Sequence, residues 1–156
     1  MSASPLRVAC IGIGWWSDVL ADAIQRSGKL TILSCYTRSE EKRNKFAAKY
    51  RCRPAASYEA MLADGEIEAI INTTPNDVHL ATTSAAAAAG KHVFLDKPIA
   101  NSVSDGRAIT EVCRKATGRQ TLNRRRTLGP KNLRRARSRS SSRSQTNGSR
   151  FLTTGP

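Results

Sequence analysis

The last 45 residues of the chain (112–156) contain no acidic residue, whereas residues 1–111 contain all 12. The same last segment carries 13 Lys and Arg residues, so it accounts for +13 of the formal net charge of +14. The first 111 residues are therefore close to neutral. For this reason the strongly basic composition gives no indication that the front of the chain binds nucleic acid.

Closely spaced cysteines, long apolar segments and the pattern typical of a leader peptide are also absent from the sequence. The four cysteines (Cys10, Cys35, Cys52 and Cys113) are scattered without a C-x-x-C pair, so neither a metal site nor a disulfide framework is favoured. No stretch reaches 18 consecutive apolar residues, and the N-terminus lacks a charged segment followed by an apolar one. We therefore expect a soluble cytoplasmic protein with no metal and no membrane partner.

Short apolar segments alternate with helical patterns along the front of the chain. Strands are predicted at Leu6–Ile11, Leu30–Tyr36, Ala69–Asn72 and His92–Leu95. Helices are predicted over 15–27, after the caps Ser39 and Ser57, after Asp77, and from near Ser104. Strands and helices that alternate at this spacing favour an α/β fold with a doubly wound parallel sheet of the Rossmann type.

The alternation stops near residue 117, so we divide the chain into an α/β domain (1–117) and an Arg/Ser-rich tail (118–156). The tail has few apolar residues, which predicts disorder, apart from one weak edge strand expected at 120–123. Its charge predicts nonspecific binding to polyanions. Phe151 is its only aromatic residue, which argues against base stacking.

A glycine-rich turn follows the first predicted strand and opens the first predicted helix. Gly12 permits a tight turn, and Gly14 lets the backbone approach a pyrophosphate, which the helix N-terminus then attracts. The third motif position is Ser17 rather than glycine, a small residue that still allows close packing of helix and strand. Trp15 and Trp16 are expected to cover the cofactor crevice or to pack between elements, rather than to take part in the chemistry. The turn predicts binding of a dinucleotide.

The end of the second strand indicates which dinucleotide is preferred. NAD-binding domains place an acid there to hold the ribose 2′-hydroxyl. Here the residues are Thr37, Arg38 and Ser39, and the later acids Glu40 and Glu41 suit the first turn of a helix. A guanidinium matches the geometry of a phosphate, so the segment favours NADP over NAD, although a solvated surface arginine is the alternative.

Two further segments make the pattern specific. Thr73-Thr74-Pro75-Asn76-Asp77-Val78-His79 follows the third apolar strand, and Asp96-Lys97-Pro98 follows the fourth. Together with the glycine turn, and in this order, they resemble the N-terminal domain of the Gfo/Idh/MocA oxidoreductases. The resemblance covers roughly residues 5–117.

The resemblance implies a role for each matching residue. Thr74, Pro75, Asn76 and His79 would lie at the cofactor near the nicotinamide ribose, and Asp96, Lys97 and Pro98 would also bind the cofactor. Lys97 would be the catalytic residue, because a cation there polarises the oxygen that is oxidised or reduced as hydride moves. Asp96 stands where the family usually has glutamate, which keeps the carboxylate but shortens its reach.

Members of that family continue into a second domain that supplies the pocket for a sugar-like or other hydroxylated small molecule. Residues 118–156 do not resemble this substrate domain. We therefore expect a truncated or frameshifted chain, catalytically incomplete as it stands, that would meet such a substrate only if a substrate domain were present. The alternatives are a non-catalytic dinucleotide-binding module and a nucleic-acid-binding protein that acts through its basic tail.

Overall fold

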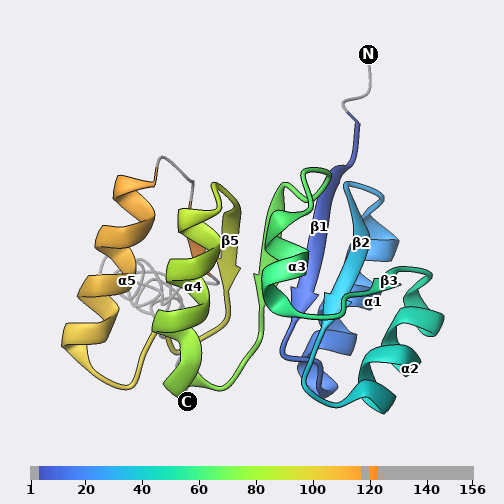
Figure 1. Cartoon of the computed structure of the whole chain (residues 1–156), viewed down its shortest axis with the longest axis horizontal. Coiled ribbons are helices and arrows are strands. Elements are labelled where there is room, and N and C mark those ends of the chain that lie inside the picture. The colour runs from blue at the N-terminus through green and yellow to red at the C-terminus, as the bar shows by residue number, and fades with distance from the viewer. Residues whose placement is uncertain (1–3, 117–119, 123–156) are drawn as a thin grey trace, which may run out of the picture. The chain divides into compact units, whose positions relative to one another are not determined.

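Residues 4–116 and 120–122 are described by the computed structural model, and they contain six strands and five α-helices (Figure 1). The strands are Leu6–Ile11 (β1), Leu30–Tyr36 (β2), Arg53–Pro54 (β3), Ala69–Asn72 (β4), His92–Leu95 (β5) and Gln120–Leu122 (β6). The α-helices are Trp15–Ser27 (α1), Glu40–Tyr50 (α2), Tyr58–Ala63 (α3), His79–Ala88 (α4) and Val103–Lys115 (α5). The chain divides into two units, and every described residue lies in the first, Met1–Asn123. Apart from β6, the predicted tail lies outside the described residues.

All six strands belong to one parallel sheet, in the order β3-β2-β1-β4-β5-β6. The four strands predicted from apolar runs have the predicted bounds, and the weak strand expected at 120–123 is present as β6. Strand β3 was not predicted, because it has two residues, one of them a proline that cannot donate to a ladder and is tolerated only at an edge. The strand order confirms the doubly wound α/β fold.

Helices cover both faces of the sheet, so the strands between them are buried on both sides. Successive residues of β1 point to opposite faces, so Val8 and Cys10 join one core cluster and Ala9 and Ile11 join the other. Helices α1 and α2 pack on the first cluster, and α3, α4 and α5 contribute to the second. Figure 1 shows α4 and α5 side by side, and these two helices contact each other along their length.

Side-chain caps set where the helices begin. The Ser39 hydroxyl accepts the amide of Lys42 at 3.3 Å, which starts α2 as predicted. The last helix begins at Val103, slightly earlier than predicted, because the cap is Ser102, whose hydroxyl accepts the amide of Asp105. Asp77 caps no helix: it lies in a 3₁₀ turn, Asn76–Val78 (η1), that leads directly into α4.

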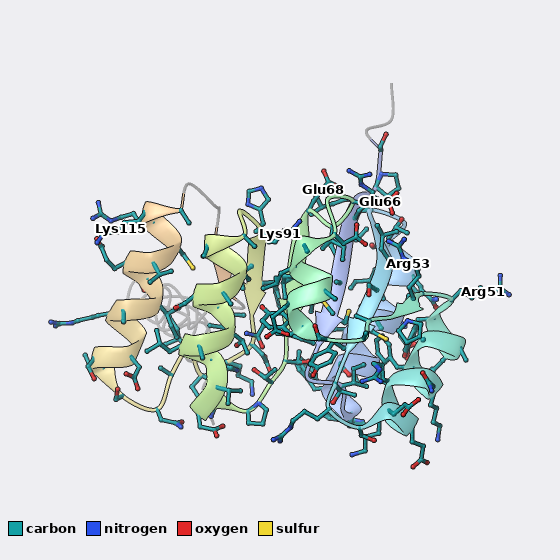
Figure 2. All side chains as sticks on the ribbon, viewed as in Figure 1. Arg51, Arg53, Glu66, Glu68, Lys91 and Lys115 are labelled. Atoms are coloured by element: carbon teal, nitrogen blue, oxygen red, sulfur yellow. The ribbon has the colours of Figure 1, made fainter. Side chains whose placement is uncertain are left out.

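Charged side chains gather where the strands begin (Figure 2). Arg53 bonds to Asp64 at 2.8 Å and to Glu66 at 3.0 Å. Lys91 is 9% exposed, and its ammonium donates to the carbonyls of Asp64 and Ile67, both at 2.8 Å. These contacts anchor the loop before β4 at the sheet edge that lies opposite the carboxyl ends of the strands.

The longest α-helices among the described residues, α1 and α5, have 13 residues each. A bilayer-spanning helix needs about 20 apolar residues. No helix in the described ranges is long and apolar enough to cross a membrane.

Candidate functional site

The carboxyl ends of four strands lie at one level. Ile11 pairs with Tyr36 on one side and with Asn72 on the other, and Asn72 pairs with Leu95. Strand order reverses between β1 and β4, so the loops that follow these strands diverge and leave a crevice of about 780 Å³. Six of the predicted cofactor residues line it: Gly12, Gly14, Thr37, Arg38, Thr74 and Pro75.

Gly12 is in close contact with the loop that follows β4. Its φ of +77° lies in the left-handed region. A β-carbon at this position would lie 2.6 Å from the carbonyl oxygen of Thr73. The Thr73 hydroxyl donates to the carbonyls of Ile11 and Gly12, each at 2.9 Å, so the two loops are joined at this point. Only glycine fits this position of the turn.

Gly14 has a different environment, because no atom lies within 4 Å of the position that a β-carbon would occupy. The Ser17 hydroxyl accepts the Gly14 amide at 2.8 Å and donates to the Gly14 carbonyl at 2.7 Å. Ser17 is 2% exposed, so it closes the first turn of α1 from the inside. The open side of Gly14 lies at the crevice beside the N-terminus of α1, where the helix dipole attracts a phosphate.

Two cationic side chains, Arg38 and Lys42, line the crevice past the end of β2. They are four residues apart, and both are exposed. The Arg43 guanidinium donates to the Thr37 carbonyl at 3.0 Å, which fixes the segment that carries Arg38. Ser39 caps α2 with its hydroxyl, so that oxygen is already engaged by the helix. Sequence reasoning missed Lys42, although its position one turn beyond Arg38 was a signal.

The loop after β4 is anchored by a buried asparagine that sequence reasoning also missed. Asn72 is 0% exposed, and its Oδ1 accepts the amide and the hydroxyl of Thr74 at 3.1 and 2.7 Å. Its Nδ2 donates to the hydroxyl of Thr82 at 2.8 Å. The Tyr58 hydroxyl donates to the Thr82 carbonyl. The Tyr58 ring stacks on the ring of Tyr36, with 6.4 Å between their centroids, and both residues line the crevice. The one signal for this anchor was a polar residue at the end of an apolar strand.

His79 lies behind the crevice and is completely buried. Its Nε2 is 2.8 Å from the Thr74 carbonyl and its Nδ1 is 3.2 Å from the Ile99 carbonyl. Both contacts are hydrogen bonds at once only when both ring nitrogens carry a proton, because a neutral imidazole has one donor. His79 therefore joins the loop after β4 to the segment before α5, and Asn76 precedes it in η1.

We expect His79→Ala to lower the free energy of unfolding by about 2–4 kcal/mol, since a partly buried carbonyl loses its donor and a cavity remains at a fully buried position. Urea unfolding of the full chain measures this. The same substitution at the partly exposed His92 is the control, with an expected loss below about 1 kcal/mol. Equal losses at the two histidines would contradict a specific role for His79.

The remaining predicted residues lie at the same edge of the sheet but do not line the crevice. Trp15 is 77% exposed, and its ring centroid is 5.8 Å from that of Trp16. The Trp16 Nε1 and one carboxylate oxygen of Asp96 are buried and have no hydrogen-bond partner in the described part of the chain. Lys97 and Pro98 follow β5, are exposed and are joined by a cis peptide bond.

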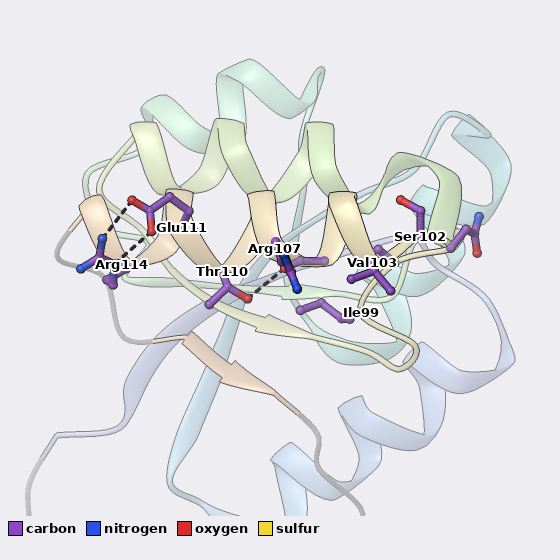
Figure 3. Close-up of a pocket in the computed structure, with 10 residues that line it drawn as sticks. Ile99, Ser102, Val103, Arg107, Thr110, Glu111 and Arg114 are labelled. Carbon is purple, nitrogen blue, oxygen red and sulfur yellow. Dashed lines mark hydrogen bonds and ion pairs between the residues drawn. The ribbon is translucent and has the colours of Figure 1, made fainter.

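A second hollow, of about 790 Å³, lies along α5 (Figure 3). Ile99, Val103 and Arg107 contribute to its walls, and the Arg114 guanidinium donates to Glu111 at 3.0 Å beside it. None of the predicted site residues lines this hollow. The crevice between the loops after β1 and β4 is therefore the candidate dinucleotide site.

Comparison with known proteins agrees with this geometry. The family model of the Gfo/Idh/MocA oxidoreductases, described as an NAD-binding Rossmann fold, matches residues 6–123. The crystal structure of an oxidoreductase from Desulfitobacterium hafniense superposes with a TM-score of 0.76 at 38% identity, over 78% of this chain and 35% of that one.

Two sequence relatives extend the match. The chain is 30% identical to 4-carboxy-2-hydroxymuconate-6-semialdehyde dehydrogenase of Sphingobium, over 67% of this chain and 33% of that protein. It is 29% identical to scyllo-inositol 2-dehydrogenase (NADP⁺) of Bacillus subtilis, over 64% of this chain and 31% of that protein. The chain spans about a third of the length of these relatives. Because the family model covers well over half of its residues, the chain belongs to the Gfo/Idh/MocA family of oxidoreductases, of which it contains the NAD(P)-binding Rossmann domain.

Proposed function

We propose that the crevice binds NADP in preference to NAD, and that it forms the cofactor half of an oxidoreductase site for a sugar-like or other hydroxylated small molecule. The observation that carries the proposal is the lining of the crevice: an open Gly14 beside a helix N-terminus, together with Arg38 and Lys42. The open helix N-terminus at Gly14 suits a pyrophosphate, and the two cationic side chains suit an additional phosphate.

The preference for NADP follows from charge. A 2′-phosphate carries negative charge that a ribose hydroxyl lacks, and both side chains that would face it are cations. Charge-assisted hydrogen bonds contribute about 1.5–3 kcal/mol each. A relative named as NADP⁺-dependent, the scyllo-inositol dehydrogenase, supports the same preference.

Residues at the edge of the sheet would perform the chemistry. The bound dinucleotide supplies or accepts the hydride. Lys97 would donate a hydrogen bond to the substrate oxygen and stabilise the negative charge that develops on it. Thr74 and Pro75 would line the cofactor pocket, and His79 would hold their loop from behind. Trp16 and Asp96 each have one buried polar atom available for a hydrogen bond to the cofactor.

These 156 residues would bind the dinucleotide without turning over substrate. Hydride transfer needs substrate and nicotinamide held together in a site closed to water, and Lys97 is exposed in the described structure. The alternatives remain a non-catalytic dinucleotide module and nucleic-acid binding by the basic tail, which lies outside the described residues. Binding without oxidation or reduction of a panel of sugars, inositols and dihydrodiols is the expected result.

Isothermal titration of the full chain with NADP⁺ and with NAD⁺ tests the proposal. We expect Arg38→Ala to weaken NADP⁺ binding by about tenfold to a hundredfold, because one charge-assisted contact is lost, and to change NAD⁺ binding by less than about twofold. Lys45→Ala is the matched control, since it removes a positive charge from α2 at a position outside the crevice. Equal losses for both dinucleotides would refute the 2′-phosphate role of Arg38, and absence of binding would refute the cofactor site itself.

A further inference from the structure

The carboxylate of Asp77 lines the crevice without a protein partner. Asp77 lies in η1, caps no helix and has an exposed side chain. No hydrogen bond or ion pair engages its carboxylate within the described residues. Of the described residues that line the crevice, Asp77 is the one that is acidic, whereas Arg38 and Lys42 are cations. A carboxylate in a crevice that suits phosphates needs an explanation of its own.

The turn that carries Asp77 is held in place on both sides. The Val78 amide donates to the Pro75 carbonyl at 3.1 Å, which closes the turn. The Thr82 hydroxyl donates to the Val78 carbonyl at 2.8 Å and accepts the side-chain amide of the buried Asn72 at 2.8 Å. The backbone of Asp77 is therefore fixed by contacts that begin in the core, and its carboxylate has a defined place in the crevice lining.

The carboxylate and the two cations stand on different sides of the crevice. Arg38 and Lys42 follow β2, whereas Asp77 follows β4, and β1 lies between these two strands. Neighbouring strands are about 4.8 Å apart, so the ends of β2 and β4 are separated by roughly 10 Å. The cations therefore meet the negative charge of a phosphate on one side. On the other side a carboxylate would repel a phosphate, so Asp77 suits an uncharged part of the ligand that donates a proton.

Apolar side chains of the crevice suit a nucleobase. The stacked rings of Tyr36 and Tyr58 line the crevice, and so does Val78, whose side chain is 37% exposed. The adenine of NADP is bonded to the ribose that carries the 2′-phosphate, so a phosphate held at Arg38 leaves the base one ribose away. The nicotinamide lies at the other end of the dinucleotide, and Lys97 does not line the crevice. The described crevice is therefore the adenosine half of the site.

We propose that Asp77 recognises the adenine of the dinucleotide by accepting a hydrogen bond from its 6-amino group, so that the crevice discriminates against a 6-oxopurine. This inference rests on the proposed binding of NADP. The 6-amino group is a donor at the edge of the base, and a hydrogen bond from it to a carboxylate is charge-assisted. A 6-oxo group has no proton to donate at that position, and its oxygen repels the carboxylate, so the wrong base is penalised twice.

Isothermal titration of the full chain with NADP⁺ and with nicotinamide hypoxanthine dinucleotide phosphate tests the inference. The two ligands carry the same phosphates and differ in the purine, so the ratio of their dissociation constants cancels the effect of charge on phosphate binding. We expect the hypoxanthine ligand to bind about tenfold to a hundredfold more weakly, because one charge-assisted hydrogen bond is lost. Tight NADP⁺ binding with a ratio near one would overturn this inference and leave the proposed cofactor site standing. Absence of binding by both ligands would refute the two together.

Two variants assign the discrimination to Asp77. Asp77→Asn should lower the ratio to below about threefold, because a carboxamide offers an oxygen to a 6-amino group and an amino group to a 6-oxo group. Asp105→Asn is the matched control, since it removes the same charge from α5 outside the crevice and should leave the ratio unchanged. Far-ultraviolet circular dichroism shows whether each variant is folded. If Asp77→Asn tightened both ligands by one factor, Asp77 would act only as a repelling charge. If it kept the full ratio, another group would recognise the base. Either result would overturn the inference.

Discussion

Gly12→Ala is expected to lower the free energy of unfolding by about 2–5 kcal/mol, from two separate causes. At φ +77° the alanine would be held in the left-handed region, which costs a residue with a β-carbon about 1–2 kcal/mol. The same atom would lie 2.6 Å from the Thr73 carbonyl oxygen, and the forced separation of two loops costs about 1–3 kcal/mol more. A loss of this size is a large part of the 5–15 kcal/mol that stabilises a typical domain.

Urea unfolding of the full chain, followed by circular dichroism, measures the Gly12 effect. Gly28→Ala is the matched control, because its φ of +62° is also left-handed but no atom lies within 4 Å of the added β-carbon. The control should therefore show only the conformational cost, about 1–2 kcal/mol. If both variants lost the same amount, the contact between Gly12 and the loop after β4 would contribute nothing.

Gly14→Val, in contrast to Gly12→Ala, is expected to keep most of its stability and to lose dinucleotide binding. The φ of −154° at Gly14 is extended backbone that valine readily adopts, and the open space around its β-carbon position accommodates a side chain. We expect a loss of stability of no more than about 1 kcal/mol, from the weaker helix cap. Dinucleotide affinity should fall by about a hundredfold, because the branched side chain occupies the approach to the helix N-terminus that the pyrophosphate requires.

The same titration and unfolding experiments compare the two glycines. If the Gly14→Val protein folds and binds NADP⁺ as tightly as the unmodified chain, the pyrophosphate must bind somewhere other than at Gly14. A protein that loses several kcal/mol of stability would show that Gly14 is structural, like Gly12. Comparing Gly12→Ala with Gly14→Val therefore separates the contribution of the turn to stability from its proposed contribution to dinucleotide binding.

Much of the architecture could be predicted because it depends on local patterns. Buried parallel strands read as short apolar runs, and the predicted bounds of β1, β2, β4 and β5 match those observed. Ser39 and Ser57 could be recognised as caps because the cap contact spans only three residues. Strand β3 could not be recognised, because Arg53–Pro54 has no pattern of its own and is extended only through its pairing with β2.

The candidate site was predicted in part for the same reason. Gly12, Arg38 and Thr74 lie in loops directly after strands, and parallel strands place such loops at one edge. Tyr58 and Asn72 were missed, since their contacts with Thr82 join segments 24 and 10 residues apart. The binding roles of the predicted residues stay predictions, including those of His79, which lies behind the crevice, and of Asp96 and Lys97, which do not line it.

By itself, the sequence determined the fold class and the family, and it indicated the loop that we propose faces a phosphate, because each is specified within a few consecutive residues or by a regular alternation. Only the tertiary structure showed that Gly12 must be glycine, that His79 joins two loops, and that Asn72 anchors the loop after β4. These features depend on atoms that are far apart in sequence and approach each other only after the sheet is assembled. The order of the strands, which brings distant loops to one edge, is what turns separate motifs into a site.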